Sequence, residues 1–424
     1  MRTLVGVVAL LAVAVTAAPA LAQSNTDMCG SNAEAYPPQQ VVNACTALIN
    51  GGGYGSADLA IIYSNRGNAW KRAGDLRSAL TDQDTALQYN PSDGITYYNR
   101  GNTRLQMGDD VGALADYDIG VRFAPTHQPI WYQRGLTRYN RGDYQQSIVD
   151  TSEAIRLSPN HADSYTNRAN GYIMTEQFPA AIADLNVAIR LEPNVALHRY
   201  NRGVANERAG NTQQAIADYA DALRIDPRYA SALGNRGNLK ASNGDVPGGI
   251  ADLTAALSIR ESVIDLNNRA YAYVSTRDYA RALADFDRAA VVAPNSHQYD
   301  NSRCWYRIMA NTQLDVARAA CDRGILGYAN NPVELANILD SRGMLNLKQN
   351  RFQDAWDDYS AAMRADSSRA SYPFGRGIAA LRLGRTEEAR SDFARAMAIE
   401  AAVAERYAGY GFPIDASLLP PPAR

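Results

Sequence analysis

Four cysteines are the residues whose spacing narrows the possible chemistry most: Cys29, Cys45, Cys304 and Cys321. They form two pairs, 16 and 17 residues apart, that are widely separated in the chain. An even number of cysteines in an exported chain favours disulfides, although four cysteines allow three pairings. The short spacings predict the bridges Cys29–Cys45 and Cys304–Cys321. A metal site made of all four thiolates is the alternative, but the sequence has no Cys-x-x-Cys motif.

Motifs typical of catalysis or cofactor binding are absent from the sequence. Histidine occurs four times, without the spacing of zinc ligands, and there is no nucleophile elbow, phosphate loop or His-Glu-x-x-His motif. Lysine plus arginine total 42 against 44 for aspartate plus glutamate, which excludes a strongly basic footprint for nucleic acid. We therefore expect no catalytic residues, no cofactor, no metal and no nucleic-acid partner.

Residues 1–22 have the pattern of a cleaved export signal. Arg2 is followed by an uncharged apolar stretch, and Ala20-Leu21-Ala22 places small residues where signal peptidase acts. The apolar stretch is short for a membrane span, which needs about 20 residues, and no later segment could cross a bilayer. We predict a mature protein that starts at Gln23, has no integral membrane span and is exported to the periplasm, where disulfides form.

A short string centred on arginine recurs along most of the chain. Ten such arginines are spaced by 33 or 34 residues, apart from one interval of 39: Arg66, Arg100, Arg134, Arg168, Arg202, Arg236, Arg269, Arg303, Arg342 and Arg376. A glycine divides most units into two apolar-periodic halves, and a proline closes six of them. Each unit is therefore predicted to be a helix–turn–helix hairpin.

This pattern resembles the tetratricopeptide repeat, with small residues at the eighth and twentieth of 34 places. Ten units cover about residues 60–401. The resemblance implies an all-α fold, a right-handed α-solenoid of about ten stacked hairpins. With one residue inserted in the turn of this unit, Cys304 and Cys321 occupy the eighth and twenty-fourth places, so their bridge would replace a small-on-large contact. We place the five extra residues of the long interval near Asn311 and within 327–332.

The arginine itself departs from the family, which usually has leucine at the seventh place. Aspartate follows it by sixteen residues in nine of the ten units, and only the eighth unit lacks this aspartate. We infer a ladder of Arg–Asp ion pairs, because a partly buried guanidinium needs a carboxylate partner whose shape it matches. A row of arginines that binds an anionic ligand is the alternative.

The first helix of each unit lines the concave face in this family. Its fifth, ninth and twelfth places are rich in tyrosine and asparagine, which suit an extended peptide backbone and apolar side chains. The candidate groove residues are Asn68, Tyr98, Asn102, Tyr132, Tyr139, Asn170, Tyr200, Asn238, Tyr271 and Trp305. Packing between neighbouring helices is the alternative role for each of them.

Both ends of the array are expected to carry caps, which a solenoid needs to stay soluble. Residues 23–58 form an N-terminal arm, with one helix at 39–50 that the first disulfide tethers. Residues 59–401 form the array. Residues 402–424 form a short capping helix followed by a tail that we expect to be disordered from Pro413 onward.

The resemblance implies a non-catalytic scaffold that binds a peptide or protein segment in the concave groove. An accessory factor for cell-envelope assembly or polysaccharide export is the alternative. The lysine and arginine clamp that some family members use for a chain terminus is not visible, since Lys71 stands alone among the groove places.

Overall fold

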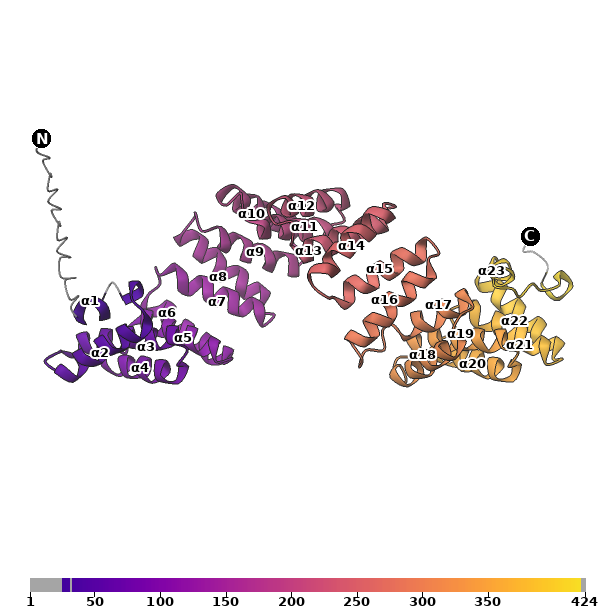
Figure 1. Cartoon of the computed structure of the whole chain (residues 1–424), viewed down its shortest axis with the longest axis horizontal. Coiled ribbons are helices and arrows are strands. Elements are labelled where there is room, and N and C mark those ends of the chain that lie inside the picture. The colour runs from indigo at the N-terminus through magenta and orange to yellow at the C-terminus, as the bar shows by residue number, and fades with distance from the viewer. Residues whose placement is uncertain (1–24, 31–32, 421–424) are drawn as a thin grey trace, which may run out of the picture. The chain divides into compact units, whose positions relative to one another are not determined.

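The computed structural model describes residues 25–30 and 33–420, so the predicted signal peptide at 1–22 lies outside the described residues. Every regular element within those two ranges is a helix (Figure 1). Among them, no helix has both the length and the hydropathy that crossing a membrane requires. The chain divides into two compact units, residues 1–194 and 195–424.

The first unit has an N-terminal segment followed by four helical hairpins. Its helices are α1 (Asn25–Cys29), η1 (Ala33–Ala35), α2 (Pro38–Gly51), α3 (Ser56–Ala73), α4 (Leu76–Tyr89), α5 (Gly94–Gln106), α6 (Asp110–Phe123), α7 (Gln128–Asn140), α8 (Tyr144–Leu157), α9 (Ala162–Met174) and α10 (Phe178–Leu191). From α3 onward, consecutive helices pair side by side, and each pair is one predicted repeat.

The second unit has six hairpins and a C-terminal cap. Its helices are α11 (Ala196–Arg208), α12 (Thr212–Ile225), α13 (Ala230–Ser242), α14 (Val246–Ile259), α15 (Val263–Ser275), α16 (Tyr279–Val292), α17 (Asp300–Ala310), α18 (Leu314–Gly327), α19 (Pro332–Lys348), α20 (Phe352–Ala365), α21 (Ser371–Arg382), α22 (Thr386–Ile399), α23 (Val403–Gly409) and η2 (Ala416–Leu418). The all-α repeat fold predicted from the sequence is confirmed.

Two local signals form the turn inside a hairpin. Gly74 ends α3 with a left-handed φ of 88°, which only glycine adopts at little cost. Asp75 then begins α4, and its side chain accepts a hydrogen bond from the backbone N–H of Ser78. Gly108 and Asp109 repeat this arrangement between α5 and α6. The sequence thus specifies these two turns within a few residues.

Small residues let the two helices of a hairpin approach each other around a buried aromatic ring. A Cβ atom added to Gly101 would lie 2.5 Å from the ring of Tyr117, and one added to Gly203 would lie 2.6 Å from that of Tyr219. Both tyrosines are fully buried. The Cys304–Cys321 disulfide occupies the equivalent position between α17 and α18, so a covalent bond replaces the small-on-large contact there.

The long interval between the eighth and ninth repeats differs in part from the prediction. One extra residue lies in the turn after α17, where Asn311 has a positive φ of 51°, as expected. The others do not lengthen the loop after α18. They extend α19, which has 17 residues against 13 in α15, because Pro332 and the Asn331 cap begin the helix one turn early.

The N-terminal arm covers the first hairpin as predicted. The helix expected at 39–50 is α2, and the Cys29–Cys45 disulfide joins it to α1. Val41 and Val42 of α2 are buried in a cluster that includes Ile62 of α3. The first helix of the predicted array, α3, starts at Ser56, and the array boundary at residue 59 stays a prediction.

The C-terminal cap is longer than predicted. The expected capping helix is α23, whose Tyr407 is 1% exposed. Disorder from Pro413 onward is wrong for residues 413–420, which include the helical turn η2. Arg390 donates a hydrogen bond to the carbonyl oxygen of Ser417 at 2.8 Å, and Leu418 packs against the hydrophobic core. Residues 421–424 lie outside the described part.

Candidate functional site

The recurring arginines hold buried carboxylates within their own hairpins. In the first repeat, Arg66 donates to both carboxylate oxygens of Asp82 at 2.7 and 2.8 Å. The aspartate side chains of these pairs are between 0% and 11% exposed. The nine pairs are Arg66–Asp82, Arg100–Asp116, Arg134–Asp150, Arg168–Asp184, Arg202–Asp218, Arg236–Asp252, Arg269–Asp285, Arg342–Asp358 and Arg376–Asp392.

The ladder also links neighbouring hairpins. Arg100 donates to Asp84 of the preceding hairpin at 2.7 Å, in addition to its own aspartate. The repeat of Arg303 lacks the usual aspartate. Arg303 likewise forms an ion pair with an aspartate of the preceding hairpin, Asp287, at 2.9 Å. These arginines are therefore occupied by carboxylates of the chain, which supports a structural role rather than a row that binds anions.

The predicted groove tyrosines of the first unit contact neighbouring helices. The ring of Tyr98 lies edge-on to His127 at 5.5 Å, and Tyr132 meets His161 in the same way one repeat later at 5.0 Å. Asn102 accepts a hydrogen bond from a buried tyrosine hydroxyl at 2.6 Å. Asn68, Tyr139 and Asn170 are half-buried. Packing explains much of this set.

Two predicted groove residues of the second unit meet at one cavity. Asn238 of α13 and Tyr271 of α15 line a cavity of about 230 Å³. Tyr271 is 45% exposed, and its hydroxyl lies 2.9 Å from the hydroxyl of Ser302. The Asn238 amide has no hydrogen-bond partner among the described residues. The Tyr271 ring packs edge-on against Phe286 at 5.3 Å, and Tyr200 likewise packs against another tyrosine ring at 4.9 Å.

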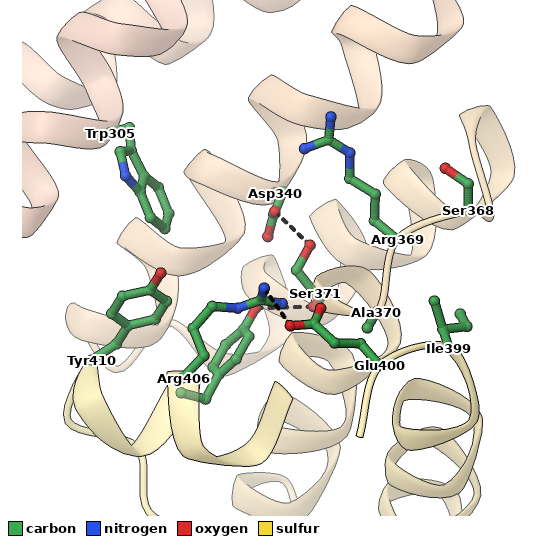
Figure 2. Close-up of a pocket in the computed structure, with 11 residues that line it drawn as sticks. Trp305, Asp340, Ser368, Arg369, Ala370, Ser371, Ile399, Glu400, Arg406 and Tyr410 are labelled. Carbon is green, nitrogen blue, oxygen red and sulfur yellow. Dashed lines mark hydrogen bonds and ion pairs between the residues drawn. The ribbon is translucent and has the colours of Figure 1, made fainter. Parts of the chain in front are cut away.

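The fourth predicted residue of this unit, Trp305, lines a larger cavity of about 530 Å³. We call it the Trp305 cavity; its walls come from α17, α19, the start of α21, and α23. Trp305 and Tyr410 lie on one side, Arg369 lies on the other, and Asp340 lies between them (Figure 2). The Trp305 and Tyr410 rings meet edge to face at 5.6 Å.

Asp340 is a buried carboxylate at this cavity. One carboxylate oxygen, Oδ2, accepts a hydrogen bond from the Ser371 hydroxyl at 2.8 Å. The other, Oδ1, is buried and has no hydrogen-bond partner within the described chain. Burial, which disfavours the charged form, raises the pKa of Asp340 to about 6, although Arg369 and Arg406 lower it. Arg406 itself pairs with Glu400 at 2.8 Å.

Sequence reasoning missed Asp340 and Arg369. Asp340 occupies the fifth place of its repeat, as Tyr98 does in the second, so extending the groove rule past the long interval finds it. Arg369 precedes α21 and lies outside that rule. It lies on the loop between α20 and α21, which the repeat pattern does not treat as part of the groove.

The raised pKa of Asp340 predicts a stability effect that depends on pH. The folded state holds the proton more tightly than the unfolded state, so deprotonation costs stability as the pH rises from about 4 to about 6. Asp340→Asn should therefore change the free energy of unfolding little at pH 4 and raise it at pH 8, by at most about 3 kcal/mol. Urea denaturation at both pH values measures this difference. The exposed Asp315→Asn serves as the control, and an equal gain at both pH values would contradict the assignment.

Solved structures with a similar fold come from repeat proteins. A tetratricopeptide repeat protein of Parabacteroides merdae matches with a TM-score of 0.48 and 16% identity over 62% of this chain and 99% of its own. A fragment from Cytophaga hutchinsonii matches with a TM-score of 0.45 and 17% identity, over 53% of this chain and 91% of its own. YrrB, described as having an unusual peptide-binding site, matches with a TM-score of 0.38 and 22% identity, over 43% of this chain and 95% of its own. Likeness at this identity concerns the fold alone.

A family model for the tetratricopeptide repeat matches residues 166–230, 200–265 and 341–405. No curated protein sequence matches the chain. The helical hairpins of the matched segments recur along the described repeats, and the glycine–aromatic contact occurs in four of them, at Gly101, Gly203, Gly343 and Gly377. Residues 166–265 and 341–405, less than half of the chain, therefore match the tetratricopeptide repeat, and the other described hairpins have the same helical architecture.

Proposed function

We propose that this chain is a non-catalytic interaction scaffold that binds a peptide or protein segment against the first helices of its hairpins. Proteins built from this repeat are generally protein-interaction scaffolds. The observation that carries the proposal is the 230 Å³ cavity at which Asn238 and Tyr271, from successive hairpins, come together.

The chemistry of this cavity suits an uncharged extended segment. The free amide of Asn238 can both donate to and accept from one peptide unit, as a β-strand neighbour would. Tyr271 offers a wide apolar face with a hydroxyl at its edge. The remaining walls include Ala241, Ala272 and Ser275, so a small side chain of the partner fits between the two helices.

The proposed location is the periplasm. The signal pattern at residues 1–22 supports export, and two disulfides support an oxidising compartment. N-terminal sequencing of the protein from a periplasmic fraction should find Gln23 first. An accessory role in cell-envelope assembly or polysaccharide export is the second candidate, and the Trp305 cavity is the feature that favours it.

Binding of short peptides tests the scaffold role directly. Peptides selected from a random display library on the purified protein should lose affinity by about tenfold or more on Tyr271→Ala, since truncating a buried aromatic anchor costs more than about 1 kcal/mol. Isothermal titration calorimetry gives the dissociation constants. Ile264→Ala, on the same helix but with a side chain that is 69% exposed, is the matched control. Equal affinity of both variants for every selected peptide would show that the cavity at Asn238 and Tyr271 is not the peptide-binding site.

A further inference from the structure

We propose that the Trp305 cavity binds a neutral oligosaccharide, with a sugar ring against Trp305 and Tyr410 and hydroxyl groups between Asp340 and Arg369. This site is separate from the cavity at Asn238 and Tyr271, so the proposal does not depend on peptide binding there.

The size of the cavity suits several sugar units. A second cavity of about 240 Å³ shares Trp305, Asp340 and Arg369 with the first cavity of about 530 Å³. The two spaces therefore adjoin the same three side chains. Together they fall within the usual range for small-molecule sites, about 300–1,000 Å³.

The unpartnered groups call for a ligand that both donates and accepts hydrogen bonds. Asp340 Oδ1 is a buried acceptor without a donor, and its carboxyl group is held in place by Ser371. The guanidinium of the exposed Arg369 forms no ion pair or hydrogen bond with the described residues. The indole N–H of Trp305 has no hydrogen-bond acceptor among the described residues either. A sugar hydroxyl can donate to the aspartate and accept from the arginine at once.

The apolar part of the site suits a pyranose ring. The C–H groups on one side of such a ring form an apolar face, which an aromatic side chain covers without losing hydrogen bonds to water. Trp305 and Tyr410 supply two such side chains at an angle of 83° to each other, one from α17 and one beside α23. The cavity therefore has both an apolar wall and a polar wall.

The charge of the site favours a neutral ligand over an ionic one. Asp340 and Glu400 balance Arg369 and Arg406, and the pair Arg406–Glu400 is already formed at 2.8 Å. The other polar walls are neutral: Asn301, Asn337, Ser341, Ser368 and Ser371. A cation or an anion would each face one repelling charge. A zwitterionic amino acid would match both free charges, but it would leave the neutral polar wall unused.

The C-terminal cap is part of this site rather than only a cover for the last hairpin. The Tyr407 hydroxyl of α23 donates to the carbonyl oxygen of Ser371 at 2.9 Å, which fixes the helix against the residue that holds Asp340. Arg406 of α23 and Tyr410, directly after its end, both line the cavity (Figure 2).

Calorimetric titration of the full mature protein with defined sugars tests the proposal. The probes are cellotriose, maltotriose and triacetylchitotriose, with glycine and lysine as zwitterionic competitors. At least one trisaccharide should bind with a dissociation constant on the order of 1 mM or tighter. No binding of any trisaccharide, or binding of the amino acids instead, overturns the proposal.

Variants then locate the binding to this cavity. Arg369→Ala removes an exposed side chain without an ion-pair partner, so the melting temperature should not change. The affinity for the sugar should fall by about tenfold. Trp305→Ala should abolish binding, and Trp356→Ala, which removes a tryptophan bonded to Glu388 elsewhere, should not. If Trp305→Ala unfolds the cap, the sugar affinity of Arg369→Ala alone decides whether the binding site is at this cavity. Unchanged affinity in Arg369→Ala and in a folded Trp305→Ala overturns the assignment.

Discussion

Asp218→Ala should lower the free energy of unfolding by about 3–5 kcal/mol, because it leaves a partly buried arginine without its carboxylate. Asp218 is 6% exposed and accepts hydrogen bonds from Arg202 Nε at 2.9 Å and from Asn206 Nδ2 at 2.8 Å. Its removal leaves several donors between α11 and α12 without their acceptor. Urea denaturation of the mature protein, followed by circular dichroism, measures the change.

A matched substitution separates the ladder from a general loss of negative charge. Asp226 follows α12 in the same unit, is exposed, and accepts a hydrogen bond from the backbone of Arg228 at 2.9 Å. Asp226→Ala should therefore cost less than about 1 kcal/mol. Asp218→Asn keeps the shape of the side chain and should fall between the two. Equal midpoints for Asp218→Ala and Asp226→Ala would show that the pairs are not stabilising.

The fold could be predicted because its determinants are local and repeated. The turn signals at Gly74 and Asp75 lie next to each other in the chain, and the glycine–tyrosine contact at Gly101 and Tyr117 recurs at Gly203. Where the register breaks, the prediction loses detail. The extra residues before the ninth repeat extend α19 rather than its loop, because Pro332 favours the first turn of a helix.

The candidate sites could be predicted only in part. The rule for groove places found Asn238 and Tyr271, which meet at a cavity, and Trp305, which lines another. The same rule also selected Tyr98, whose ring contacts Tyr117 of its own hairpin and His127 of the next repeat. Periodicity places a side chain on a helix face, but it does not show whether that side chain borders a cavity. The contribution of α23 to the Trp305 cavity depends on contacts distant in sequence.

The Cys304–Cys321 bridge predicts the second large effect on stability. Cys304→Ala with Cys321→Ala should lower the free energy of unfolding of the second unit by about 3–5 kcal/mol. Closing a loop of this length contributes about 3 kcal/mol in the chain-entropy model, and the two fully buried sulfur atoms would leave a cavity in the core. The eighth repeat also lacks the ladder aspartate, since Ala320 stands there, and a different ion pair, between Arg323 and Asp300, joins its two helices.

The other disulfide provides the comparison that isolates position from loop length. Cys29→Ala with Cys45→Ala deletes the same atoms and opens a loop one residue shorter, but the bridge joins the terminal helices α1 and α2. In a repeat array each hairpin is stabilised by contacts with its neighbours. Loss of a bond at one end therefore destabilises only that end, whereas loss of an internal bond destabilises the hairpins on both sides. Hydrogen exchange should therefore rise within residues 25–51 in the N-terminal variant and across α15 to α20 in the internal one. A wider or larger effect of the N-terminal variant would mean that the internal bridge does not replace the missing contacts.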